Sequence, residues 1–140
     1  MTGLRYLGVD LGTRRIGLAL SEPGGIVSPL AELPAGASAD ENARAILAVA
    51  REYAAEAIVI GLPLNMDGTE GPQAKLSRTL AEAIGRLDPL PVHLHDERLT
   101  SHAADRRLID RDLTRKKKKA RQDAVAAQIL LESFLQGEVP

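Results

Sequence analysis

The chain of 140 residues contains no cysteine and no tryptophan, and its aromatic residues are two tyrosines and one phenylalanine. Without cysteine, disulfide bridges and thiolate metal sites are excluded, and a reducing compartment suits the protein. No apolar run approaches the length that spans a membrane. Residues 1–3 lead into a predicted strand without the basic and apolar regions of a signal peptide. We therefore expect a cytoplasmic protein with no membrane partner.

The formal net charge of the chain is −1, which by itself indicates no preference for nucleic acid. The charges are unevenly placed, however: residues 98–121 have a net charge of +7, and the rest of the chain has −8. This asymmetry indicates an anionic partner on one side of the molecule. A solvated helix face is the alternative interpretation, and four consecutive lysines at residues 116–119 weigh against it.

The stretch around Asp10 predicts a β-hairpin at the centre of a sheet. Residues 4–7 are mostly apolar and predict a buried strand, and residues 16–20 alternate large apolar residues with glycine and alanine in a second strand. Gly12 marks the turn between them. Asp10 closes the first strand, where a buried carboxylate needs an arginine, a group of backbone amides or a metal ion as its partner.

The rest of the chain alternates helices and strands. We expect an edge strand at 26–33, a helix after a capping box of Ser38 and Glu41, a strand at 57–60, a helix from Pro72, a strand at 91–95, a helix from Thr100 or Ser101 to about Ile109, and a final helix over 121–135. Residues 111–121 are charged and unpatterned, which predicts a mobile segment. The fold class is therefore α/β: a single three-layer domain over residues 1–140, with a mixed five-stranded sheet and helices on both faces.

Two of these helices have predicted apolar faces. The predicted faces are Ala43, Ile46, Leu47, Ala50, Tyr53 and Ala54 in the first helix, and Leu76, Leu80, Ile84 and Leu87 in the second. Each face is expected to pack against the sheet.

Three carboxylates lie where a purely structural role is hard to supply. Asp10 ends the first strand, Glu97 follows the last strand, and Asp123 begins the final helix. Strand ends at one sheet edge converge, and ligands of open α/β sheets bind beyond the carboxyl ends of the parallel strands. Clustered carboxylates repel each other unless a cation compensates them, and Mg²⁺ or Mn²⁺ takes hard oxygen ligands. The pattern therefore favours a metal site.

Each of these residues also has a structural alternative. A first-turn acid such as Asp123 is stabilised by the helix dipole. The two other carboxylates could pair with arginines: Asp10 with Arg14 or Arg15, and Glu97 with Arg98 or Arg121. His93 and His95 alternate with apolar residues in the last strand, so we expect one of them to pack against a helix rather than to bind a ligand.

Four motifs of the chain resemble the YqgF/RuvX family, which is described as pre-16S rRNA nucleases and, by analogy, Holliday junction resolvases of ribonuclease H-like fold. The motifs are Asp10-Leu-Gly12-Thr-Arg-Arg15-Ile-Gly17-Leu-Ala19, Gly61-Leu62-Pro63-Leu-Asn65-Met-Asp67-Gly68, Asp96-Glu97-Arg98-Leu-Thr100 and Asp123-Ala-Val-Ala126-Ala127. The resemblance covers nearly the whole chain, and the four motifs occur in the order and at the spacing of the family.

The resemblance implies a metal-dependent nuclease that hydrolyses phosphodiester bonds, in 5′-end maturation of pre-16S rRNA and on branched DNA. Asp10, Glu97 and Asp123 would be catalytic and hold one or two Mg²⁺ or Mn²⁺ ions, with an activated water as nucleophile. The implied nucleic-acid contacts are Arg14, Arg15, Asn65, Arg98, Thr100, Lys116, Lys117, Lys118 and Lys119, with Asp67 near the substrate. Asp96 is expected either to support the metal ligands or to serve as an alternative ligand.

The implied partners are an rRNA precursor, branched DNA and ribosomal particles, bound by a monomer or a homodimer. With so few aromatic residues, recognition is expected to depend on backbone and shape rather than on base stacking. Two alternatives stay open. One is an RNA- or ribosome-binding factor without catalysis, which would bind equally well in EDTA. The other is a single-lobe ATP-binding protein of the actin and sugar-kinase class, suggested by the Asp-Leu-Gly-Thr string around Gly12.

Overall fold

The computed structural model describes residues 3–99 and 115–138, and for residues 99, 115–123 and 138 it describes the backbone alone. Its centre is one five-stranded sheet with the strand order β3-β2-β1-β4-β5. The strands are β1 (Tyr6–Leu11), β2 (Arg15–Ser21), β3 (Val27–Pro34), β4 (Ala57–Leu62) and β5 (Val92–Asp96). Strand β2 runs antiparallel to β1 and β3, whereas β4 is parallel to β1 and β5 to β4. The predicted mixed sheet is confirmed.

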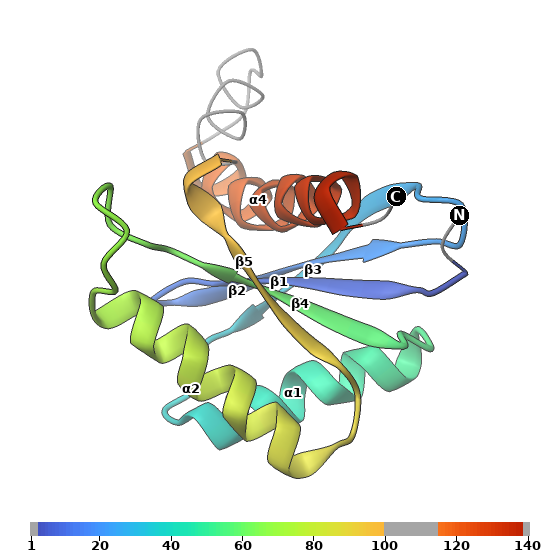
Figure 1. Ribbon diagram of the computed structural model, residues 1–140, viewed down its shortest axis with the longest axis horizontal. Coiled ribbons are helices and arrows are strands. Elements are labelled where there is room, and N and C mark those ends of the chain that lie inside the picture. The colour runs from blue at the N-terminus through green and yellow to red at the C-terminus, as the bar shows by residue number, and fades with distance from the viewer. Residues whose placement is uncertain (1–2, 100–114, 139–140) are drawn as a thin grey trace.

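Helices cover both faces of this sheet (Figure 1). Helices α1 (Ala39–Glu52) and α2 (Pro72–Leu87) lie on one face, and α4 (Arg115–Glu138) lies on the other. A short 3₁₀ turn, η1 (Glu97–Leu99), follows β5. Within the described residues, no helix is both long enough and apolar enough to cross a membrane.

Successive side chains of β1 point to opposite faces of the sheet and so contribute to a core on each face. Leu7 and Val9 are fully buried against α1 and α2, so Gly8 and Asp10 belong to the α4 face. A β-carbon at Gly8 would lie 3.0 Å from Leu131 Cβ and 3.1 Å from the carbonyl oxygen of Ala127. The missing side chain at Gly8 therefore lets α4 pack closely on the central strand.

Several local predictions are confirmed. β3 is an edge strand, which accommodates Pro29. Ser38 caps α1 by accepting a hydrogen bond from the Glu41 N–H at 3.1 Å, and Glu41 Oε2 accepts one from the N–H of Ala37 at 2.7 Å. Pro72 begins α2, where its missing N–H costs nothing.

Three local predictions are wrong. Residues 115–121 belong to α4 rather than to a mobile segment, because lysine, arginine and alanine are good helix formers and no glycine or proline interrupts them. Tyr53 and Ala54 leave the apolar face of α1, since the helix ends at Glu52 and Ala54 adopts a left-handed conformation with φ of 56°. The helix from Thr100 or Ser101 to about Ile109 stays a prediction, because it lies outside the described residues, as do residues 111–114 of the predicted mobile segment.

The third error concerns which residues of α2 are buried. Ala74, Ser77, Leu80, Ala83 and Ile84 form its buried face. Leu76 and Leu87 flank that face and are 53% and 39% exposed. Helical spacing predicts that both pack against the sheet, but spacing gives the side of a helix and not how far its neighbours cover that side.

Candidate active site

Asp10 and Glu97 meet at the carboxyl ends of β1 and β5. Burial of Glu97, its side-chain hydrogen bond with Asp10 and the negative charges of Asp10 and Asp96 raise the pKa of Glu97 to about 9. At neutral pH the pair therefore holds one proton between the two carboxyl groups. The predicted convergence of these two residues is seen in the structure.

Gly61, near the end of β4, makes room for Glu97. A β-carbon at Gly61 would lie 2.5 Å from Glu97 Oε1 and 2.6 Å from its Cδ. The Glu97 carboxyl group thus lies directly on the backbone of the strand next to β1. Gly61 belongs to the second sequence motif, and nothing in the linear pattern indicates that Glu97 folds onto it.

The third predicted carboxylate, Asp123, lies within α4, and its side chain is outside the described part of the structure. Within that part, no group of three or more aspartate, glutamate or histidine side chains is placed to hold a metal ion. The donor set that the structure does bring together is a pair of carboxyl groups, and such hard oxygen donors suit Mg²⁺ or Mn²⁺.

Asp96 and Arg98, the two sequence neighbours of Glu97, form a close ion pair with each other. Arg98 Nη2 lies 2.7 Å from Asp96 Oδ2, and Arg98 Nε donates to the same oxygen at 2.9 Å. The backbone N–H of Arg98 also donates to Asp96 Oδ1 at 2.9 Å. The hydrogen bonds and charge of Arg98 hold the pKa of Asp96 below its usual value. Asp96 is thus engaged with Arg98.

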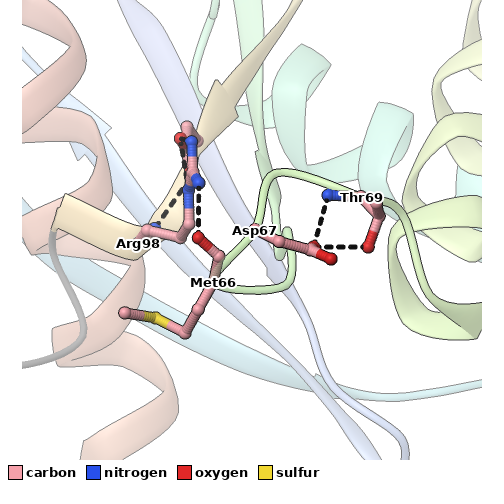
Figure 2. A network of polar contacts seen from close by, with 5 residues as sticks. Met66, Asp67, Thr69 and Arg98 are labelled. Carbon is pink, nitrogen blue, oxygen red and sulfur yellow. Dashed lines mark hydrogen bonds and ion pairs between the residues drawn. The ribbon is translucent and has the colours of Figure 1, made fainter.

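Arg98 also contacts the loop between β4 and α2, residues 63–71 (Figure 2). Its Nη1 donates to the carbonyl oxygen of Met66 at 3.4 Å. On the same loop, Asp67 Oδ1 accepts hydrogen bonds from the N–H and the hydroxyl of Thr69, at 3.0 and 2.6 Å. These bonds lower the pKa of Asp67. Asn65 Nδ2 donates to Thr69 Oγ1 at 3.0 Å, so the loop holds its own shape and is tied to the end of β5.

The structure places none of the other predicted nucleic-acid contacts in this cluster of Glu97, Arg98 and the β4–α2 loop. Arg15 lies on the α4 face with its Nη1 3.8 Å from Glu32 Oε2, and Arg14 is exposed in the β1–β2 turn. Residues 116–119 belong to α4, and the structure describes their backbone alone. Thr100 and the lysine side chains lie outside the described residues.

The histidines of β5 have packing roles, as expected for at least one of them. His95 Nε2 is 2.9 Å from Ser133 Oγ of α4. The His93 ring lies 5.1 Å from the Phe134 ring, centroid to centroid. Both contacts fix α4 over the sheet rather than supply a ligand to the site.

The family model described as "RuvX: Holliday junction resolvase" matches residues 4–137. The chain belongs to the RuvX family. A protein of Acidiphilium cryptum named "Putative pre-16S rRNA nuclease" is 46% identical to it over 132 residues, which cover 94% of this chain and 83% of that relative. The predicted family is confirmed, and the single-lobe ATPase interpretation is not favoured.

Solved structures similar to this RuvX-family chain include the fowlpox virus resolvase in complex with substrate Holliday junction DNA. The match has a TM-score of 0.58 at 11% identity and covers 98% of this chain and 100% of that one. Thermus thermophilus RuvC in complex with a Holliday junction substrate matches with a TM-score of 0.54 at 16% identity, covering 96% and 94% of the two chains. This likeness shows the fold, which is the ribonuclease H-like fold that was predicted.

Proposed function

We propose that this RuvX-family chain, acting as one domain, is a metal-dependent nuclease that hydrolyses phosphodiester bonds. The first substrate class is a pre-16S rRNA precursor, in maturation of its 5′ end, and the second is branched DNA. The observation that carries the proposal is the Asp10–Glu97 pair. The two carboxyl groups lie so close that one of them keeps a proton at neutral pH, which means that the fully ionised pair is unfavourable. A divalent cation stabilises the fully ionised pair.

Asp123 is the proposed third member of the site. The Tyr6 ring of β1 lies 5.6 Å from the Phe134 ring, and Gly8, further along β1, faces Leu131 and Ala127. Moving along β1 toward Asp10 therefore corresponds to moving back along α4. Position 123 is one helical turn before Ala127 and on the same face of α4. This register supports a place for Asp123 beside the end of β1.

These residues would hold one or two Mg²⁺ or Mn²⁺ ions, which when bound would activate a water and stabilise the leaving oxyanion. The protein's own contribution is positional. Gly61 lets the Glu97 carboxyl group lie flat on β4, and the Arg98–Asp96 pair fixes the turn that carries Glu97. Deprotonation of the Asp10–Glu97 pair must precede or accompany the binding of the cation, because a protonated carboxyl group is a poor ligand.

Contacts to the phosphate backbone are proposed for the basic residues around this edge. Lys116–Lys119 lie one to two turns before Asp123 on α4. Arg14, Arg15 and Arg98 flank the same strand ends, and Thr100 is included from its place in the sequence motif after Arg98. Asn65 and Asp67 are on the loop that Arg98 contacts. Such contacts fix the position of the nucleic acid and do not read its sequence. They are compatible with a monomer or a homodimer acting on free RNA or on ribosomal particles in the cytoplasm.

The test is cleavage of a labelled single-stranded rRNA precursor segment and of a four-way DNA junction, each with Mn²⁺ or Mg²⁺ and with EDTA. Wild-type protein should cleave one of them only with the metal, and Asp10→Asn should abolish cleavage while the protein stays folded. Asp88→Asn is the matched control, because Asp88 lies at the far end of α2 and pairs with Arg51. Binding that ignores EDTA, without cleavage of either substrate, would instead indicate a non-catalytic RNA-binding factor.

A further inference from the structure

A cavity of about 280 Å³ opens at the same sheet edge as the acidic pair, on the opposite face of the sheet. Its walls come from the β1–β2 turn, the segment between β3 and α1, the first turn of α1, and the first half of α2. Leu11, Leu76 and Leu80 supply its largest apolar surfaces. No charged side chain lines it among the residues that the structure describes. The proposed phosphodiester chemistry does not use this cavity.

The walls combine apolar surface with a polar edge. Leu76 is 53% exposed although it lies on an amphipathic helix, so the cavity presents apolar surface to solvent. Asn42 Oδ1 accepts a hydrogen bond from the N–H of Gly36 at 2.6 Å. This leaves Asn42 Nδ2 with no hydrogen-bond partner anywhere in the described ranges. Apolar walls with a small number of placed polar groups are typical of sites for flat organic ligands.

A tight turn separates the cavity from the acidic pair. Asp10 and Leu11 are consecutive and lie on opposite faces of β1. Gly12 follows them, donates to the carbonyl oxygen of Arg15 at 2.9 Å, and would bring a β-carbon within 2.8 Å of that oxygen. The missing side chain at Gly12 thus keeps the turn tight. Only this turn separates the acidic pair from the cavity, and a nucleotide chain passing Asp10 would cross it to place a base there.

We propose that the cavity takes one unpaired nucleobase adjacent to the phosphate that meets Asp10 and Glu97. This inference rests on the proposed nuclease function and narrows its substrate. An uncharged, largely apolar cavity does not hold a free phosphate or a metal ion, whereas a base offers a flat face to Leu76 and an acceptor to Asn42 Nδ2. A base within a duplex is stacked and paired and does not enter such a cavity. The preferred substrate therefore has a single-stranded nucleotide beside the cleavage point.

The experiment measures kcat/KM for metal-dependent cleavage of the single-stranded precursor RNA, after the cleavage point has been mapped with the wild-type protein. A second RNA carries an abasic nucleotide on either side of that point, and a third has these nucleotides paired with a complementary strand. Each RNA is tested with wild-type protein, with Leu76→Ala, and with Leu87→Ala as the matched control. Leu87 is also an exposed leucine of α2, but it lies at the other end of the helix and does not line the cavity.

Leu76→Ala should lower kcat/KM for the intact RNA about threefold to tenfold, because it removes an apolar contact to the base. The loss should disappear with the abasic RNA and with the paired RNA, and Leu87→Ala should match the wild type throughout. An equal loss with intact and abasic RNA, or no loss with either, would overturn the base site while leaving the nuclease function in place. Absence of cleavage by the wild-type protein on every RNA would refute the proposed function and this inference together.

Discussion

The carboxyl group of Glu97 occupies the space that a side chain at Gly61 would need, with Oε1 2.5 Å from the position of a β-carbon there. Glu97 follows β5, and Gly61 lies on β4, the strand between β5 and β1. Glu97 can therefore reach Asp10 only because the intervening strand carries no side chain at this point. The relationship makes Gly61 a positioning residue for the proposed metal site.

Gly61→Ala should displace the Glu97 carboxyl group and lower Mn²⁺ affinity about tenfold or more, in the range seen when residues that orient metal ligands are changed. Isothermal titration calorimetry would measure the affinity, and thermal unfolding would show that the protein still folds. In the Gly61→Ala background, Glu97→Asp should recover part of the affinity, since a shorter side chain avoids the added methyl group.

The control for this substitution is Gly85→Ala. Gly85 lies inside α2, and a β-carbon there would meet nothing within 4 Å. It should stabilise the protein by about 0.5 to 1 kcal/mol through helix propensity and leave Mn²⁺ affinity unchanged. Unaltered Mn²⁺ affinity in Gly61→Ala as well would show that Glu97 is not held by this contact.

The meeting of Asp10 and Glu97 could be predicted from the sequence, whereas the way they meet could not. Both residues follow apolar strands, and the carboxyl ends of parallel strands share one edge. That Glu97 crosses the backbone of Gly61 depends on the register of β4 and β5 and on the path of one side chain. The shared proton follows from that path, because it needs both the burial and the hydrogen bond.

The interpretation of Arg98 shows a second limit. The phosphate contact predicted for Arg98 stays a prediction, and the structure adds that the 3₁₀ turn after β5 brings its guanidinium onto Asp96, two residues earlier. Sequence spacing alone does not reveal this pairing, since residues two apart do not face each other in a regular helix. The exposed position of Leu76 could not be predicted for a similar reason, because periodicity gives the spacing of a helix face and not how far neighbouring elements cover it.

The raised pKa of Glu97 predicts how the stability of the metal-free protein depends on pH. The folded state favours the protonated carboxyl group, with a pKa of about 9 against an ordinary value of 4.5. This group's contribution to the unfolding free energy is therefore complete below pH 4.5 and is lost as the pH rises toward 9. Glu97→Gln, which stays neutral, should be more stable than wild type in EDTA by several kcal/mol at pH 8 and nearly equal to it at pH 4.5.

Urea unfolding at pH 4.5, 6, 7 and 8 would measure this difference. Glu52→Gln is the control, because Glu52 is an exposed residue at the end of α1, and its curve should parallel that of the wild type. Parallel curves for Glu97→Gln and wild type would show that Glu97 ionises in the folded protein as it does in the unfolded chain.

Binding of Mn²⁺ at pH 7 should release about one proton, because the cation binds the fully ionised Asp10–Glu97 pair and the metal-free pair holds one proton. Calorimetric titrations in buffers of different ionisation enthalpy would count the protons released. The number should fall to about one half at pH 9 and toward zero above it, because the metal-free pair loses its proton around that pH. A count of zero at pH 7 would mean that both carboxyl groups are already ionised or that the metal binds elsewhere.

The lysines at 116–119 and Arg98 should contribute differently to the salt dependence of RNA binding. Replacing the four lysines by alanine should reduce the slope of log Kd against log salt concentration by about 0.7 for each lysine that contacts a phosphate of a single strand. Arg98→Gln should change the slope less, because the Arg98 charge is already compensated by Asp96 at 2.7 Å. Fluorescence anisotropy at several salt concentrations would measure both slopes, with Arg44→Gln on the exposed surface of α1 as the control.

An unchanged slope after loss of all four lysines would show that they form a solvated helix face. An effect of Arg98→Gln as large as that of a phosphate-binding lysine would show that Arg98 leaves Asp96 to bind a phosphate.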